Sequence, residues 1–420
     1  MNTIMTATSP VSFSPTMSPL LGSLGTLAGA EMVNRLTRIL TAVALSRVLG
    51  PKEFGIAAIV LTSSEFIRIF TQTGIGARII SASAIDLDKI CHAAYRLNCL
   101  LYSTILVAQL ALAWPIALAY DDHSIAGLIA ALAIPYALFP AASVQVYRVQ
   151  RNSRMSATGF MSIILISGDN ILAALFALAG MGLWSIVIPK IIVAIAWVIT
   201  YRKLDSWRPT SKPDIAMLHD TWRFGRMVLF TELVSAMRLQ GDKLLLGQLV
   251  GLSLLGTYYF AFNAGLGITS AIITACSAAL LPYFANIPKG AAIRARFFKA
   301  TFLLYALLLP IFALQIGFAP WYVPIVFGQK WASSVPLMMV LCASGIPFVL
   351  WRATSILLRA VGKPAFEFRF TLALTIVSLG CLCVTAHLGL FAIASAQLII
   401  NAVFCPIFTI ITIKHLSKEP

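Results

Sequence analysis

Residues 301–319 read TFLLYALLLPIFALQIGFA, a stretch without a charged residue that is long enough to cross a lipid bilayer as one helix. Similar stretches recur along the 420 residues of the chain, of which 59% are apolar and 11% are charged. Soluble domains carry about 25% charged residues, so this composition excludes a water-soluble protein. The chain is therefore predicted to be an all-α polytopic membrane protein.

The lengths of the apolar runs predict about twelve transmembrane helices, which the chain can hold because each span uses about 20 residues. The predicted spans are 24–46, 54–76, 93–117, 124–146, 158–180, 182–201, 224–248, 252–284, 297–319, 332–357, 367–388 and 389–413. A polar stretch from Arg202 to Arg223 divides them into six and six. The predicted parts are a disordered tail at 1–20, a six-helix lobe at 21–202, a cytoplasmic linker at 203–221 and a second six-helix lobe at 222–420.

The basic residues are distributed unequally between alternate loops. Of the 31 Lys and Arg residues, 21 lie in one set of loops and in the C-terminal tail, and 3 lie in the opposite set, namely Arg47, Lys52 and Lys330. Cytoplasmic loops are enriched in Lys and Arg, so the first set of loops and both termini are predicted to be cytoplasmic. Much of the net charge of +16 then follows from topology and does not indicate nucleic-acid binding.

The two halves resemble each other at a shift of 201 residues. This shift superposes Gly50–Gly55 on Gly251–Gly256 and pairs Glu31 with Glu232. Glycines that merely end helices are the alternative explanation, but they do not account for the paired glutamates. An even number of spans per half gives both lobes the same orientation, so the pattern predicts a parallel repeat whose lobes enclose a central path.

Seven basic residues fall inside predicted spans: Arg35, Arg38, Arg68, Lys190, Arg238, Lys243 and Arg352. Five acidic residues accompany them: Glu31, Glu65, Asp169, Glu232 and Asp242. An ionisable group inside a bilayer costs about 2.5 to 3.5 kcal/mol and mostly faces a bundle interior or a wet cavity. The excess of two positive charges inside the membrane predicts an anionic passenger.

Several of these segments resemble a known family. Leu45–Gly55, LSRVLGPKEFG, is similar to the first-helix signature of the polysaccharide flippase family. Asp242–Gly251, DKLLLGQLVG, and Leu255–Ala261, LGTYYFA, resemble that family's pattern across the seventh and eighth spans. The resemblance covers nearly the whole chain, including Gly362–Pro364 after the tenth span, and Lys243 is a departure from the pattern.

The resemblance implies membership of the multidrug/oligosaccharidyl-lipid/polysaccharide exporter superfamily, whose members are two-lobed alternating-access transporters. It implies that the protein is a flippase and not an enzyme. Its passenger would be a polyprenyl-pyrophosphate-linked oligosaccharide, moved to the outer leaflet of the bacterial inner membrane for exopolysaccharide, capsule or O-antigen synthesis. The implied partners are this lipid-linked oligosaccharide, the lipid bilayer and a polysaccharide polymerase.

No cofactor is expected. Gly362-Lys363 lacks the upstream glycine of a phosphate-binding loop, so ATP hydrolysis is not expected either. The seven cysteines lie in or beside apolar runs and no partner stands at metal-ligand spacing, so no metal site is predicted.

Arginine suits a pyrophosphate because its planar guanidinium bonds two phosphate oxygens at once. Five arginines are therefore expected to line the substrate-binding lumen: Arg35, Arg38, Arg68, Arg238 and Arg352. For Arg68, an ion pair with Glu65 that only fixes packing is the alternative, since three residues separate them on one helix face. Three acids are candidates for coupling transport to protons or sodium: Glu31, Glu232 and Asp242. Local pairing with Arg238 is the alternative for the last two.

The tryptophans have two expected roles. Trp184, Trp321 and Trp331 are expected to anchor the protein at the membrane interface. Trp351, in the tenth predicted span, is a candidate for stacking on sugars.

Two other functions remain open. One is a cation-coupled multidrug exporter of the same superfamily, for which a more acidic lumen is expected. The other is a membrane-embedded polysaccharide polymerase or glycosyltransferase, which usually carries a large outer loop or a cytoplasmic catalytic segment. The sole sizeable loop, 202–223, is too short to build such a site.

Overall fold

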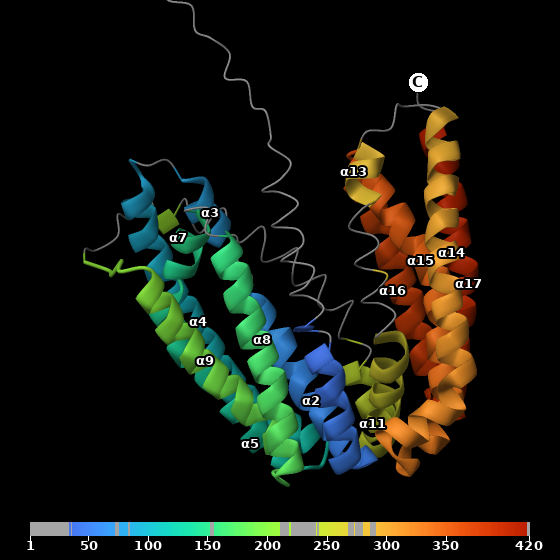
Figure 1. Ribbon diagram of the computed structural model, residues 1–420, viewed down its shortest axis with the longest axis horizontal. Helices are drawn as coiled ribbons and strands as arrows, with labels where there is room; N and C mark the ends of the chain where they lie inside the picture. Colours follow the sequence, from blue (N-terminus) through green and yellow to red (C-terminus); the bar gives the residue numbers. More distant parts are fainter. Residues whose placement is uncertain are drawn as a thin grey trace, which may run out of the picture.

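The computed structural model of the chain is helical and without strands throughout the residues that it describes. These residues are 33–34, 36–71, 75–82, 85–151, 155–210, 218–219, 241, 243–267, 273, 280–285 and 291–417. Figure 1 shows the helices of the first half, coloured blue to green, on one side and those of the second half, coloured yellow to red, on the other. The predicted all-α polytopic fold is confirmed.

The first half begins with a helix over residues 36–48. It continues with α2 (Pro51–Arg68), η1 (Ile69–Thr71), α3 (Ile75–Ser81), α4 (Leu87–Ala119), α5 (Ser124–Ala131), α6 (Ile134–Leu138), η2 (Phe139–Ala142), α7 (Gln145–Arg151), α8 (Met155–Leu178) and α9 (Trp184–Leu204). The predicted tail at 1–20 lies outside the described residues, and the predicted lobe boundaries stay predictions.

The second half begins, within the described residues, with a helix over residues 243–250. It continues with α11 (Leu252–Phe262), η3 (Asn263–Gly267), α13 (Leu280–Ala285), α14 (Ala291–Tyr322), η4 (Val323–Phe327), η5 (Gln329–Ser334), α15 (Val335–Ala360), α16 (Pro364–Thr385), η6 (Ala386–Leu388) and α17 (Leu390–Ser417). Helical segments therefore lie at all twelve predicted spans, and eight of the described segments are long and apolar enough to cross a membrane.

The glycine motif fixes the start of the second helix in each half. The Gly50 N–H donates to Glu53 Oε2 at 2.7 Å, which satisfies a donor at the beginning of α2. Pro51 occupies the first helical position, where the missing N–H costs nothing. In the second half, Gly251 precedes α11 with a φ of 81°, a conformation that glycine adopts readily.

The two halves converge at one end of the molecule and diverge toward the other (Figure 1). At the converging end, α2 and α11 lie side by side, and no pair of described helices packs more extensively. The helix α7 and the C-terminal end of α17 lie at the diverging end. Among the described residues, contact between the halves is therefore concentrated at the end where α2 and α11 begin.

The chain that follows α9 packs onto the first half. The Arg148 guanidinium lies 3.0 Å from the Asp205 carboxylate, and the Trp207 indole N–H donates to Asp88 Oδ1 at 2.9 Å. Gln145 donates to the Trp207 carbonyl at 2.9 Å. The first part of the predicted linker is thus held against α4 and α7.

Candidate functional site

Three of the predicted site residues lie in the part of the chain that the structure describes. Arg38 is exposed on the helix over 36–48, Arg68 ends α2, and Arg352 lies in α15. The others lie outside the described residues: Arg35, Arg238, Glu31, Glu232 and Asp242. No hydrogen bond or ion pair within the described ranges joins the three arginines to one another, so the lumen and ion-coupling assignments stay predictions.

Arg352 is half-buried in α15. Its Nε is buried and has no hydrogen-bond partner among the described residues. Further along α15, Arg359 pairs with Glu367 at 2.7 Å and so has its charge compensated. A buried donor without an acceptor is unfavourable, and the predicted lumen role of Arg352 stays a prediction.

Arg68 forms a local ion pair. Its Nε and Nη2 donate to Glu65 Oε2 at 2.9 and 2.7 Å. Both side chains are about half exposed, so the pair contributes little to stability. In this conformation the charge of Arg68 is matched by a carboxylate.

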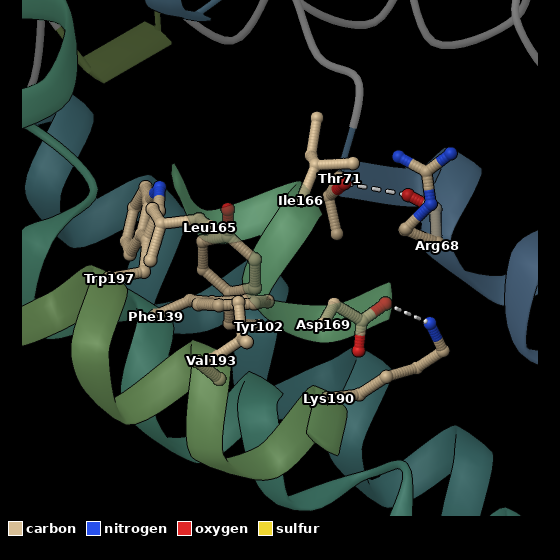
Figure 2. A pocket seen from close by; sticks show the side chains of 11 residues that line it. Arg68, Thr71, Tyr102, Phe139, Leu165, Ile166, Asp169, Lys190, Val193 and Trp197 are labelled. Carbon is tan, nitrogen blue, oxygen red and sulfur yellow. Dashed lines mark hydrogen bonds and ion pairs between the residues drawn. The ribbon is translucent and has the colours of Figure 1, made fainter. Parts of the chain in front are cut away.

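Arg68 also lines a pocket of about 490 Å³ in the first half (Figure 2), a volume in the range of small-molecule sites. Side chains from α2, η1, α4, η2, α8 and α9 surround it: Arg68, Thr71, Tyr102, Phe139, Leu165, Ile166, Asp169, Lys190, Val193, Ala194 and Trp197. Helices that are far apart in sequence thus form a single concave surface.

The pocket has an aromatic side and a polar side (Figure 2). On the aromatic side, the Phe139 ring lies edge-to-face with Tyr102 at 5.9 Å and with Trp197 at 5.3 Å between centroids. On the polar side, Lys190 Nζ lies 2.8 Å from Asp169 Oδ2. The sequence places both members of this ion pair inside spans, but it gives no signal for the aromatic cluster.

The Asp169–Lys190 ion pair predicts that two neutralising substitutions are less harmful to stability together than either is alone. Asp169→Asn or Lys190→Gln alone leaves one partly buried charge uncompensated, because the side chains are 24% and 38% exposed. We expect each single variant to lower the melting temperature in detergent, because its free energy of unfolding falls, by less than the roughly 3–5 kcal/mol lost when a fully buried pair is broken. The double variant should recover most of the loss, and a double variant less stable than both single variants would contradict this expectation.

Apart from the pocket, the structure shows close packing of the two halves at the converging end. A Cβ added to Gly55 would lie 1.8 Å from the Leu252 carbonyl oxygen, and one added to Gly256 would lie 1.8 Å from the Pro51 oxygen. The shift of 201 residues converts each contact into the other. The predicted equivalence of the two glycines is therefore confirmed, and it reflects a direct backbone approach between α2 and α11.

Hydrogen bonds between the halves follow the same symmetry. Arg47 and Gln248 occupy equivalent positions at the shift of 201 residues. The Arg47 guanidinium donates to the carbonyl oxygens of Ile325 and Val326, the latter at 2.8 Å. Gln248 donates to the Ala119 oxygen at 2.8 Å. In each half, a side chain that ends the first helix therefore binds the end of the third helix of the other half.

Two aromatic side chains donate hydrogen bonds in the reverse sense, from the region after the third helix of one half to the first helix of the other half. The Trp331 indole N–H donates to the Ser46 oxygen at 2.9 Å, and the Tyr120 hydroxyl donates to the Leu244 oxygen at 2.9 Å. Each donor follows the third long helix of its half, α14 or α4. Each acceptor lies in the first helix of the other half.

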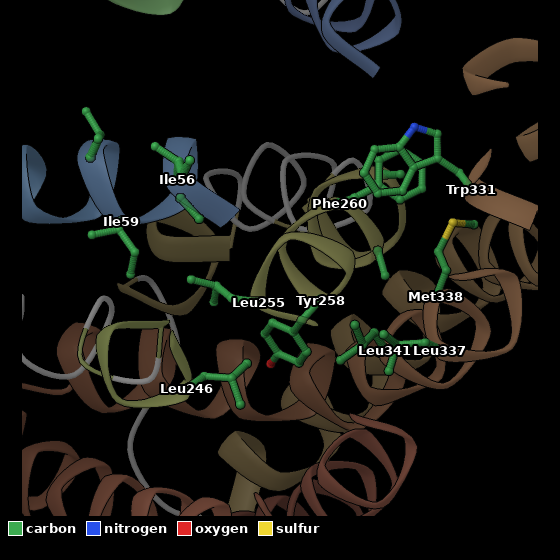
Figure 3. Packing of buried hydrophobic residues seen from close by; sticks show 14 of the residues in the cluster. Ile56, Ile59, Leu246, Leu255, Tyr258, Phe260, Trp331, Leu337, Met338 and Leu341 are labelled. Carbon is green, nitrogen blue, oxygen red and sulfur yellow. The ribbon is translucent and has the colours of Figure 1, made fainter. Parts of the chain in front are cut away.

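The core of this contact is aromatic and aliphatic (Figure 3). Trp331 is fully buried, stacks on Phe260 at 4.0 Å and meets Phe54 at 4.9 Å. The expected interfacial anchor at Trp331 is wrong, because the indole is needed between the two halves. Trp351 is also buried, and its ring centroid lies 4.4 Å from that of Phe408. The ring therefore packs within the second half and is not available to stack on sugars.

The three basic residues of the sparsely charged loops all lie at this end. Lys330 Nζ donates to the Arg47 oxygen at 3.0 Å and to the Leu49 oxygen at 2.7 Å. Lys52 pairs with Asp122 at 2.9 Å. The hydrogen bond from the Ser124 hydroxyl, with the Lys52 ammonium, keeps the pKa of Asp122 below its usual range.

We call the contact between the halves the closure. It consists of the glycine crossing and of five side-chain donors: Arg47, Tyr120, Gln248, Lys330 and Trp331. The sequence alone uses Arg47 and Lys330 only to predict topology. Their role in the closure has no sequence signal, because their acceptors are backbone carbonyls, which every residue carries.

Comparison with known proteins identifies the family. Residues 44–336 match the polysaccharide biosynthesis protein family. The chain is 25% identical over 317 residues to the teichuronic acid biosynthesis protein TuaB of Bacillus subtilis, covering 72% of this chain and 63% of TuaB, less than two thirds of its length. It is 21% identical over 377 residues to the succinoglycan biosynthesis transport protein ExoT of Rhizobium meliloti, covering 87% and 74%.

Solved structures agree on the fold. The lipid II flippase MurJ, in an inward closed conformation, is similar with a TM-score of 0.73 at 10% identity, covering 92% of this chain and 87% of that one. An inward-facing multidrug resistance transporter of the MATE family is similar with a TM-score of 0.68 at 14% identity, covering 94% and 98%. The chain therefore has the fold of these two transporters, and it belongs to the polysaccharide biosynthesis protein family.

Proposed function

We propose that the protein moves polyprenyl-pyrophosphate-linked oligosaccharide units from the cytoplasmic to the outer leaflet of a bacterial inner membrane by alternating access. The family and the names of the relatives support a role in polysaccharide transport. The observation that carries the mechanism is the reciprocal closure at one end of two similar halves. A contact of this kind can break at one end while an equivalent contact forms at the other.

The unequal distribution of basic residues gives this closure a direction. If the sparsely charged loops face outward, as the positive-inside rule predicts, the closure lies on the outer side and both termini are cytoplasmic. We infer that this arrangement, with the halves joined on the outer side, belongs to the state in which substrate is loaded from the cytoplasm. The polar head of the substrate requires a wet path, because hydrocarbon cannot satisfy its hydrogen bonds, whereas the polyprenyl tail stays in lipid.

The charges inside the membrane fit a pyrophosphate passenger. We propose that Arg352, whose Nε has no hydrogen-bond partner in the part of the chain that the structure describes, and Arg38 bind the pyrophosphate on the path, together with Arg35 and Arg238. Outward movement of an anion is favoured by an inside-negative potential, by about 2.3 kcal/mol per charge per 100 mV. Glu31, Glu232 and Asp242 remain candidates for coupling to protons or sodium.

The test is the lipid composition of a deletion strain. Without the protein, lipid-linked repeat units should accumulate on the cytoplasmic leaflet, where an external glycosidase cannot reach them, and expression of the protein should remove them. Accumulation on the outer leaflet would indicate a polymerase instead. Sensitivity to cationic drugs without accumulation would indicate a multidrug exporter.

Arg352→Gln should fail to complement this strain and should reduce polymer yield about tenfold or more, because an Arg–phosphate bond is charge-assisted and bidentate. Arg294→Gln is the matched control, since Arg294 is exposed at the beginning of α14. Polymer yield and the amount of protein in the membrane are measured for both variants. Normal yield with Arg352→Gln at normal protein levels would remove Arg352 from the path.

A further inference from the structure

The pocket beside α9 lies within the first half and not between the halves. All of its lining residues fall between Arg68 and Trp197. One edge of the pocket is formed by Arg68, the last residue of α2, and by Thr71 in η1 (Figure 2). Both residues lie at the end of α2 that is away from the closure. A pocket of about 490 Å³ can hold only part of a lipid-linked oligosaccharide.

The charges of the pocket are balanced. Lys190 lies 2.8 Å from Asp169, and Arg68 lies 2.7 Å from Glu65. A pyrophosphate bound here would have to displace these carboxylates or lie beside them, at a cost in like-charge repulsion. The balance therefore disfavours a multiply charged anion and favours a neutral polar ligand.

The arrangement of aromatic and polar groups narrows the class of ligand. A sugar ring has a face of C–H groups, which packs well against aromatic carbon, and a rim of hydroxyls that donate and accept hydrogen bonds. Tyr102, Phe139 and Trp197 supply the aromatic side (Figure 2). The Lys190 ammonium has three N–H donors, one of which is directed at Asp169.

We propose that this pocket binds a neutral sugar residue of the transported glycan, while the pyrophosphate binds to the arginines of the central path. The inference rests on the proposed function and divides the substrate between two sites. It assigns to the first half a role in selecting the glycan. A sugar bound beside α9 also orients the rest of the substrate along the path.

Photo-crosslinking in the producing strain tests this assignment with the native substrate. The probe p-benzoyl-phenylalanine replaces Ile166 or Val193, which line the pocket, in the full chain. After irradiation and purification, we expect protein adducts that carry sugars. Mild acid, which cleaves the bond between the sugar and the pyrophosphate, should release polyprenyl pyrophosphate and leave the sugars attached to the protein. The control position is Leu303, which is 70% exposed on α14 in the other half and should give no sugar adduct.

A second set of variants tests which groups hold the sugar. Asp169→Asn combined with Lys190→Gln keeps the pocket neutral, and we expect the sugar adduct at Val193 to fall about fivefold or more, since the ionised hydrogen-bonding groups are lost. Arg294→Gln should leave the adduct unchanged. Adducts that carry only lipid, or no adduct at either probe position, would overturn the inference. The proposed function is judged separately, by accumulation of lipid-linked units in the deletion strain.

Discussion

Replacing Gly55 by alanine is expected to weaken the contact between the two halves strongly and to reduce transport. The new methyl group would lie 1.8 Å from the Leu252 oxygen, a backbone atom that cannot move aside as a side chain can. Overpacking of a core usually costs about 1–3 kcal/mol, so the equilibrium should shift toward the state open at this end by about tenfold or more. Gly256→Ala should have the same effect, because the contact is reciprocal.

The readout is the reactivity of one introduced cysteine. Ala58→Cys places a thiol one turn after Gly55, at a fully buried position of α2. A membrane-impermeant maleimide added from outside the cell should label this cysteine slowly in the protein that carries only Ala58→Cys. Labelling should be about tenfold faster when Gly55→Ala is added. The chain without Ala58→Cys gives the background labelling, which is subtracted.

Gly127→Ala is the matched control, because a Cβ at Gly127 in α5 meets no atom within 4 Å. It should leave both labelling and polymer yield unchanged. If Gly55→Ala supported normal polymer yield with slow labelling, the backbone contact would not be required for closing.

Removing the lysine that joins the halves is the second change with a large expected effect. Lys330→Met eliminates two hydrogen bonds, to the oxygens of Arg47 and Leu49. Hydrogen bonds with a charged partner contribute about 1.5–3 kcal/mol in buried settings and less where water competes. We therefore expect labelling at Ala58→Cys to increase about five- to tenfold, with a similar increase for Arg47→Met.

Lys52→Met separates this effect from a general effect of charge. Lys52 has the same charge and lies at the same end, but its side chain is 66% exposed and its partner, Asp122, belongs to the same half. Exposed ion pairs contribute about 0–1 kcal/mol, so labelling should change less than twofold. An equal increase for Lys52→Met and Lys330→Met would show that the outer charge, and not the contact between the halves, sets the equilibrium.

The part of the fold that depends on local sequence could be predicted. Apolar run lengths located the spans, because a helix in lipid must satisfy its backbone internally. The shift of 201 residues identified Gly55 and Gly256 as equivalent, because both halves need the same absence of a side chain at the crossing. Neither signal required knowledge of how the helices pack.

The pocket could not be predicted, because it depends on packing between distant segments. Tyr102, Phe139 and Trp197 come from α4, η2 and α9, and no spacing in the sequence relates them. Asp169 and Lys190 are 21 residues apart on successive helices, outside the three- and four-residue spacings by which ion pairs on a single helix are found. The expected interfacial role of Trp331 is wrong because its burial arises only when the second half meets the first.

The acceptors in the closure have a consequence for how such proteins diverge. The oxygens that receive the bonds between the halves all belong to the backbone, among them those of Ser46, Ala119, Leu244 and Val326. Every residue type supplies such an oxygen, so these positions can drift in evolution without loss of the bond. Only the donor of each bond constrains which amino acid is used. Relatives with few identical residues can therefore keep the same junction, and a search for it should compare donors and helix ends rather than matched pairs.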